Sequence, residues 1–92
     1  MYLHLGQDVV IRKKDIIGIY DIDNTTISRH TRDFLAACQK SGKVITTTNE
    51  LPKSFIVCNE NGNIMVYISQ ISASTLQKRN VSGMDEIFSK EN

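Results

Sequence analysis

The chain has 92 residues, of which 40% are hydrophobic and 23% are charged, and its 11 basic and 10 acidic residues leave a net charge of +1. This balance excludes a disordered acidic segment and a strongly basic arm that coats nucleic acid. A run of about 18 apolar residues that could span a bilayer is missing, and Met1 leads directly into a strand-like run rather than a signal peptide. We therefore expect a cytoplasmic protein without membrane contact, with one domain over residues 1–80 and a tail over residues 81–92 that forms at most a frayed helix.

The first dozen residues predict two short strands joined by a tight turn. Residues 2–5 alternate in polarity, Gly6 and Asp8 suit a turn, and an apolar triplet follows at residues 9–11. Leu3, Leu5 and Val10 are the expected core positions, which leaves Tyr2 and His4 exposed.

Residues 16–22 are rich in β-branched side chains on both faces, which predicts a central strand. Gly18 within this run indicates a bulge or a close backbone approach. The run ends in Asp21-Ile-Asp23-Asn-Thr25, a D-x-D-x-T pattern that resembles the nucleophile loop of haloacid-dehalogenase-type phosphatases. In such an enzyme the two aspartates would act beside a magnesium ion, whereas the alternative is a polar turn between a strand and a helix.

The apolar spacing changes to a helical period after residue 27. Ile27, Thr31, Phe34, Leu35 and Cys38 form one stripe, which predicts an amphipathic helix over residues 28–40. A hydroxyl of Thr25 or Thr26 is the expected N-cap, and Gly42 is the expected left-handed residue after the helix.

The second half of the chain predicts a strand near residues 43–48 and then a β-hairpin. The apolar runs 55–58 and 64–68 flank Asn61-Gly62, a pair that favours a two-residue turn. Ser72–Arg79 predicts a short helix capped by its hydroxyl residues. The fold class is therefore α+β, with a small antiparallel or mixed sheet, one main amphipathic helix and a short C-terminal helix.

Histidines and cysteines give little sign of catalysis. Cys38 and Cys58 lack the spacing of a disulfide framework or a zinc site, so two buried thiols are expected. His4 and His30 have no acidic or thiol partner at ligand spacing, so we expect no cofactor and no metal.

Basic side chains form the candidate DNA-binding set. Arg29 and Arg32 lie opposite the apolar stripe of the helix, where a solvated outer face containing an Arg29–Asp33 pair is the alternative explanation. The remaining candidates lie in loops, namely Arg12, Lys13, Lys14 and Lys53.

Taken in order, four segments resemble the extracellular-matrix regulatory protein B family of Gram-positive bacteria. They are Tyr2–Val10, Asp15–Asp21, Pro52–Val57 and Ser72–Arg79, so the resemblance spans residues 1–79. It implies a relation to the A-type regulators, which form rings of small α/β subunits and bind promoter DNA without a cofactor. It also implies a biofilm regulator that self-associates and works beside a paralogue.

The chain departs from the A-type pattern in two loops. Where those proteins present arginines, this sequence has Asp15 and Leu51-Pro52. Their DNA contacts therefore do not transfer directly. Three functions follow in order of preference: a non-enzymatic, oligomeric DNA-associated regulator, a structural subunit acting only through protein contacts, and a magnesium-dependent phosphatase using Asp21 and Asp23.

Overall fold

The computed structural model describes residues 1–22 and 28–82. Their elements are β1 (Tyr2–Gly6), β2 (Val9–Arg12), the 3-10 turn η1 (Lys13–Asp15), β3 (Ile16–Asp21), α1 (Arg29–Lys40), β4 (Val44–Thr46), β5 (Ser54–Glu60), β6 (Asn63–Ser69) and α2 (Ala73–Ser82). The predicted α+β class, main helix and short C-terminal helix are confirmed.

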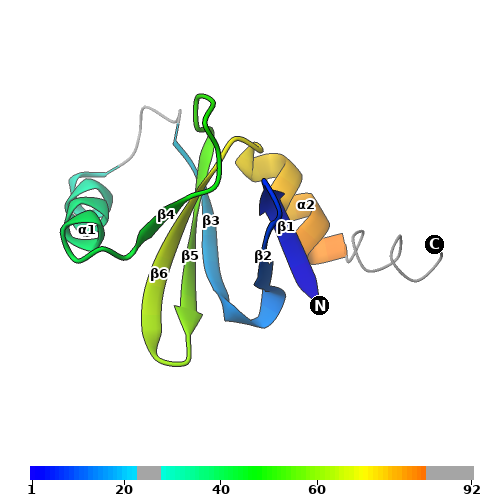
Figure 1. Cartoon of the computed structure of the whole chain (residues 1–92), viewed down its shortest axis with the longest axis horizontal. Helices are drawn as coiled ribbons and strands as arrows, with labels where there is room; N and C mark the ends of the chain where they lie inside the picture. Colours follow the sequence, from blue (N-terminus) through cyan, green and yellow to red (C-terminus); the bar gives the residue numbers. More distant parts are fainter. Residues whose placement is uncertain (23–27, 83–92) are drawn as a thin grey trace.

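Two sheets form the scaffold. β1 and β2 make a separate antiparallel hairpin, while the larger sheet has the order β3-β5-β6-β4, with β4 parallel to β6 and the other pairs antiparallel. α1 lies on one side of the larger sheet, and the hairpin and α2 lie on the other (Figure 1). The sheet is thus the middle layer of the molecule.

The inner face of the larger sheet, which faces the hairpin and α2, carries the main core. Leu3, Leu5 and Leu76 are fully buried there against Ile56 and Cys58 of β5. The period-2 alternation of β5 sends these two side chains to this face and Phe55 and Val57 to the opposite one. Both faces of β5 are therefore buried, which makes β5 a central strand.

The prediction that residues 16–22 form a central strand was wrong, because β3 lies at the edge of the sheet. Its apolar side chains do not all find cover: Ile17 is 57% exposed and Tyr20 is 45% exposed. Gly18 does mark the predicted irregularity, since the pairing register with β5 shifts between Ile16 and Gly18. A Cβ atom at Gly18 would meet the ring of Tyr20 at 2.3 Å from its hydroxyl oxygen, so the glycine lets this ring lie along the strand.

The turns follow the sequence signals closely. Asn61 and Gly62 both have positive φ, at 55° and 90°, as a primed hairpin turn requires. In the first hairpin Gly6, Gln7 and Asp8 have positive φ, and a register irregularity lies between His4 and Gly6. This shift places Val10 on the exposed face opposite His4, so the prediction of Val10 as a core residue was wrong, and Ile11 is buried instead.

The helix termini differ in part from expectation. α1 begins at Arg29, and its N-cap is Ser28, whose Oγ accepts a hydrogen bond from the backbone N–H of Thr31 at 3.1 Å. The residues predicted as the N-cap, Thr25 and Thr26, lie outside the described residues, and the N-cap is Ser28 instead. Gly42 has the expected positive φ of 70°. In α2 the Ser72 hydroxyl accepts from the Thr75 N–H at 3.3 Å, which confirms the predicted capping, but the helix continues to Ser82.

Candidate nucleic-acid and assembly surfaces

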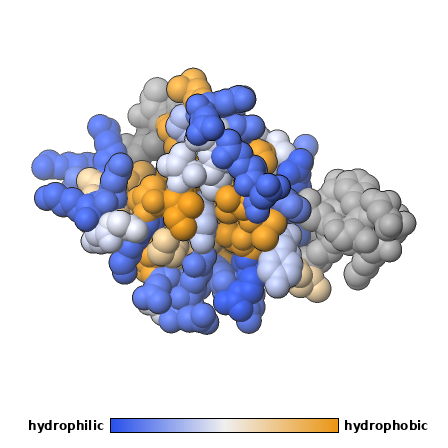
Figure 2. All heavy atoms as spheres, viewed as in Figure 1, coloured by the Kyte–Doolittle hydropathy of each residue, from blue (hydrophilic) through white to orange (hydrophobic). Residues whose placement is uncertain are grey.

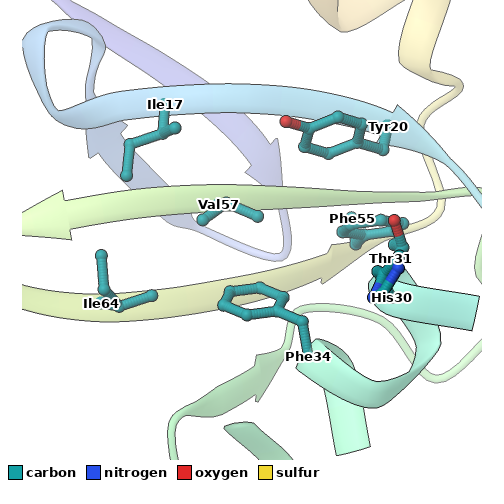
Figure 3. Close-up of a pocket in the computed structure, with 8 residues that line it drawn as sticks. All are labelled: Ile17, Tyr20, His30, Thr31, Phe34, Phe55, Val57 and Ile64. Atoms are coloured by element: carbon teal, nitrogen blue, oxygen red, sulfur yellow. The ribbon is translucent and has the colours of Figure 1, made fainter.

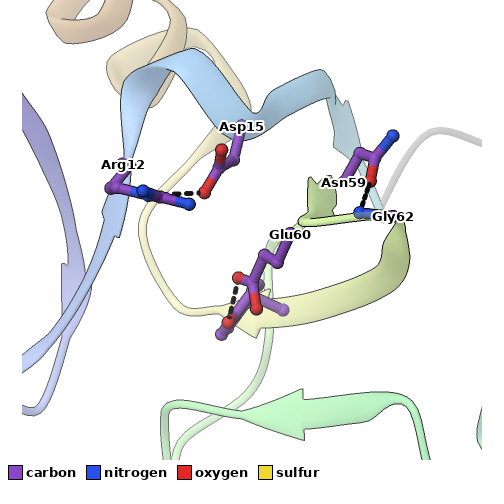
Figure 4. A network of polar contacts seen from close by, with 6 residues as sticks. Arg12, Asp15, Asn59, Glu60 and Gly62 are labelled. Carbon is purple, nitrogen blue, oxygen red and sulfur yellow. Dashed lines mark hydrogen bonds and ion pairs between the residues drawn. The ribbon is translucent and has the colours of Figure 1, made fainter.

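The basic turn between β2 and β3 is partly engaged with the protein itself. The Arg12 Nε donates a hydrogen bond to the Asp15 Oδ2 at 2.9 Å, and this ion pair leaves little net charge at that position (Figure 4). The Lys13 Nζ donates to the backbone oxygen of Arg79 at 3.0 Å, which ties the turn to α2. Lys14 is exposed. It is therefore the residue of this turn best placed to meet a phosphate.

Lys53 lies far from that turn within one subunit. It precedes β5, whose first residue Ser54 pairs with Asp21 at the end of β3, whereas η1 precedes the start of β3. The two loops are consequently separated by the length of β3, roughly 20 Å for six extended residues. A single copy does not bring Lys14 and Lys53 together.

Arg29 and Arg32 are exposed on α1, on the side of the sheet away from α2. The predicted Arg29–Asp33 ion pair is not observed, although both residues lie in the described part of the chain, whereas Arg12 and Asp15 do form an ion pair. In the view of Figure 2, hydrophilic side chains cover α1 and the turns at the lower end of the strands, whereas apolar surface gathers in the middle of the molecule. The basic candidates thus lie on three separate elements: the turn between β2 and β3, the loop before β5, and α1.

An apolar groove lies between α1 and the outer face of the larger sheet, which is the face opposite the main core (Figure 3). It has a volume of about 390 Å³. Its lining residues come from β3, β5, β6 and α1, namely Ile17, Tyr20, His30, Thr31, Phe34, Phe55, Val57 and Ile64. The rings of Tyr20 and Phe55 stack with their centroids 5.0 Å apart and form one wall. The sequence did not predict this groove, although Phe34 and Tyr20 could each be recognised in it as large apolar residues.

Buried ionisable groups lie on the inner face of the sheet rather than in the groove. Desolvation by burial raises the pKa of the Cys58 thiol to about 12, with smaller contributions from the charges of Glu60 and Asp15. Burial, followed by the hydrogen bond that its hydroxyl donates to Glu60, raises the pKa of Tyr67. Both groups remain protonated at neutral pH, so they serve the core rather than acid–base chemistry.

The expected thiol state is confirmed, because Cys38 and Cys58 are both free and buried. In the described part of the chain, His, Cys, Asp and Glu side chains do not gather in groups of three that could hold a metal ion.

The phosphatase hypothesis depends on Asp21 and Asp23. Asp21 ends a strand that pairs, among the described residues, with β5 alone and in the antiparallel sense, whereas the haloacid-dehalogenase arrangement calls for a parallel sheet around this position. Asp23 lies outside the described residues. The fold therefore gives the resemblance of this short motif no support.

Polar side chains hold the loop between β4 and β5 against the sheet. The Thr47 Oγ1 lies within hydrogen-bonding distance of two backbone oxygens, that of Ile68 at 2.8 Å and that of Leu5 at 3.1 Å. The Thr48 hydroxyl also bonds to the side chain of Gln70. These buried hydroxyls fix a loop that places Leu51 at the surface, 80% exposed.

Comparison with known proteins identifies the family. The model of the RemA-like family, described as extracellular matrix regulatory protein A-like, matches residues 2–79. The chain belongs to this family. It is also 39% identical over 79 residues to extracellular matrix regulatory protein B of Bacillus subtilis (strain 168), which covers 86% of this chain and 89% of that protein. The sequence resemblance is thereby confirmed, and it places the chain in a family of regulators rather than in an enzyme family.

The match has a definite end within α2. It stops at residue 79, so the last residues of the chain lie beyond the family model. Across residues 1–22 and 28–82, neither helix is long and apolar enough to cross a membrane.

Proposed function

We propose that the protein is a non-enzymatic regulator of extracellular-matrix gene expression that acts as an oligomer on DNA in the cytoplasm, beside a paralogous regulator. The family match over residues 2–79 is the observation that carries this proposal. The name of the Bacillus subtilis relative supplies the process, matrix regulation.

The distribution of basic side chains explains why such a protein would act as an assembly. A single copy offers Lys14 at one end of β3, Lys53 at the other end, and Arg29 and Arg32 on α1. With a net charge of +1, one copy attracts DNA weakly. Repeating each exposed cation around an oligomer places many of them along one duplex, and the weak contacts then act together.

Contacts of this kind position a protein on the phosphate backbone without reading bases. Promoter preference would then depend on the shape of the DNA or on the paralogue. Arg12 contributes less than its neighbours, because Asp15 already balances its charge.

The test is fluorescence anisotropy with duplex DNA from upstream of a matrix gene, measured across a salt series. The logarithm of the binding constant should fall linearly with the logarithm of salt concentration, by about 0.9 per phosphate neutralised. Lys14→Ala and Lys53→Ala should each reduce this slope, whereas Lys78→Ala on α2, outside the proposed set, is the matched control. Absence of binding at low salt, or binding that ignores salt, would refute the proposal.

A second candidate is an assembling subunit that acts only through protein contacts. It is favoured by the internal hydrogen bonds of Arg12 and Lys13, which engage two of the candidate cations with the protein itself. The hairpin β5–β6 cannot offer a free edge for this purpose, because both of its strands are paired on both sides. Among the described residues, the outer strands of the larger sheet are β3 and β4, and β1 and β2 of the separate hairpin each have one unpaired edge as well. Oligomers that form normally and never bind DNA would support this candidate over the first.

A further inference from the structure

The groove beneath α1 is an apolar surface that nothing in the described part of the chain fills. Phe34 reaches from the helix towards Val57 and lies between Ile64 and Phe55, while the stacked Tyr20 and Phe55 rings lie at one end of the lining (Figure 3). Phe34 remains 39% exposed. Aromatic rings with this much exposure around a hollow are typical of a site that another apolar side chain enters.

The loop between β4 and β5 offers such a side chain. Leu51 is the most exposed of the large hydrophobic residues in the described ranges. The loop that carries it is fixed at both ends: the Thr47 N–H donates to the oxygen of Ile68 at 2.9 Å, and the Lys53 N–H donates to that of Ser69 at 2.8 Å. The Glu50 N–H also donates to the Thr48 Oγ1 at 2.9 Å. Because the loop is anchored on both sides of Leu51, this side chain is held at the surface, 80% exposed and outside the groove of its own chain.

The charges beside the two surfaces are complementary. Glu50 is exposed next to Leu51. The groove is bordered by the first turn of α1, which contains Arg29 and His30 and no acidic residue. The N-terminal end of a helix carries a partial positive charge that favours a nearby carboxylate. A second copy that places Leu51 in the groove would bring its Glu50 towards this positive end.

We infer that the occupant of the groove is the Glu50–Leu51 loop of a second copy of this chain. Leu51 inserts among Tyr20, Phe34 and Val57, and Glu50 meets the basic start of α1. Arg29 therefore serves this contact, and Arg32, Lys14 and Lys53 are left for DNA. Since the loop and the groove are different surfaces, the contact is heterologous: each copy gives its loop to one neighbour and its groove to another. The inference rests on the proposed self-association and names the surfaces that produce it.

Sedimentation velocity of the full chain over a range of concentrations tests the contact. Removing a buried leucine side chain should weaken association on the order of 10- to 100-fold, so Leu51→Ser should shift the assembly towards monomer. Phe34→Ser should do the same from the groove side. Val10→Ser is the matched control, because Val10 is also an exposed apolar residue but lies on the solvent-facing side of the β1–β2 hairpin, away from the groove.

Mixing two defective variants gives the sharper test. Leu51→Asp removes the loop contact but keeps an intact groove, and Phe34→Asp does the reverse. Each alone should remain monomeric, whereas an equimolar mixture should form a dimer through the one intact loop and the one intact groove. Circular dichroism of each variant controls for folding. A charge exchange tests the polar part of the contact. Glu50→Arg alone should weaken association, and the double variant Glu50→Arg with Arg29→Glu should restore it.

Several results would overturn the inference. Leu51→Ser without effect on the mass, an equal loss from Val10→Ser, or no dimer in the mixture would each do so. A chain ending at Ser82 that becomes monomeric while Leu51→Ser still assembles would make residues 83–92 the occupant. If any of these results is found together with salt-dependent DNA binding, the groove inference fails but the proposed DNA-binding function stands. If assembly depends on Leu51 but DNA is not bound, the proposed DNA-binding function fails and the groove inference stands.

Discussion

The two faces of the larger sheet are covered to very different extents. On the inner face, the hairpin and α2 close over a core in which Leu3, Leu5 and Leu76 are fully buried. On the outer face, α1 buries only Cys38 completely and leaves the groove open beside it. One face is packed as a protein interior, whereas the other keeps an open apolar groove.

The elements that cover the two faces of the sheet are also attached to it in different ways. The hairpin and α2 are fixed to the sheet by hydrogen bonds as well as by packing, such as the Ser69 Oγ to the oxygen of Leu5 and the Gln77 Nε2 to that of Ile19. α1 contributes Cys38 and the partly buried Leu35 to the smaller cluster around Phe55 and Val66. We therefore expect the inner face to contribute more to the free energy of unfolding than the outer face, where the proposed contact between copies lies.

The largest expected effect tests this contrast directly. Leu76→Ala removes a fully buried side chain from the inner face and should cost about 2–5 kcal/mol of unfolding free energy. Phe34→Ala, on the half-open outer face, should cost on the order of 1 kcal/mol, because part of its ring is already in water. Urea denaturation at several protein concentrations measures both, since a change in assembly would otherwise alter the apparent stability. Equal losses would mean that both faces are packed alike.

The pH dependence of the free energy of unfolding tests the same contrast between the two faces. Cys58, whose pKa is raised to about 12, lies on the inner face. The pKa of the Cys58 thiol has its ordinary value of 9.0 in the unfolded chain and about 12 in the folded one, so unfolding releases a proton between pH 9 and pH 12. The free energy of unfolding therefore does not depend on this thiol below pH 9. As the pH rises from 9 towards 12, ionisation of Cys58 in the unfolded chain lowers that free energy by up to about 1.4 kcal/mol per pH unit.

Urea denaturation at a series of alkaline pH values measures this slope. Cys58→Ala should flatten it, and Cys38→Ala, which changes a buried thiol on the outer face, is the control. An unchanged slope in Cys58→Ala would assign the alkaline loss to Tyr67, whose pKa is raised in the same direction.

Local signals in the sequence predicted the local structure well. The Asn61-Gly62 turn, the helical stripe ending at Cys38 and the left-handed Gly42 each follow from the conformations that these residue types prefer within a few positions. The burial of Leu3 and Leu5 followed from alternation in the same way. These features depend on neighbours along the chain.

Features that depend on distant segments were not predictable. The run 16–22 is apolar on both faces, but its place at the sheet edge is decided by which strands pair with β5. Val10 was misplaced because the irregularity after His4 shifts the register of the hairpin. The groove joins residues from four elements, so its lining could not be read from any one segment.

The candidate DNA-binding residues show the same division. Their charge was visible in the sequence, whereas the engagement of Arg12 with Asp15 and of Lys13 with Arg79 required the fold. The separation of Lys14 from Lys53 also followed only from the pairing of Asp21 with Ser54.

The smallest expected effect concerns the start of α1, the element that borders the groove. The Ser28 Oγ accepts from the Thr31 N–H at 3.1 Å and also bonds to the Thr31 hydroxyl at 3.0 Å. Ser28→Ala should therefore cost about 1 kcal/mol, whereas Ser28→Asp keeps an acceptor for the cap and adds a negative charge that suits the helix dipole.

Global stability and assembly should respond differently to these two variants. Because α1 adds little to the main core, Ser28→Ala should lower the urea midpoint slightly but speed hydrogen exchange in the first turns of α1, while α2 exchanges as before. Ser28→Asp should hold the fold yet weaken association, since its carboxylate takes the position beside the basic first turn that Glu50 of a neighbouring copy is inferred to occupy. Tighter association of Ser28→Asp would contradict this placement of Glu50, and faster exchange in α2 would show that the two faces of the sheet are coupled more strongly than their packing indicates.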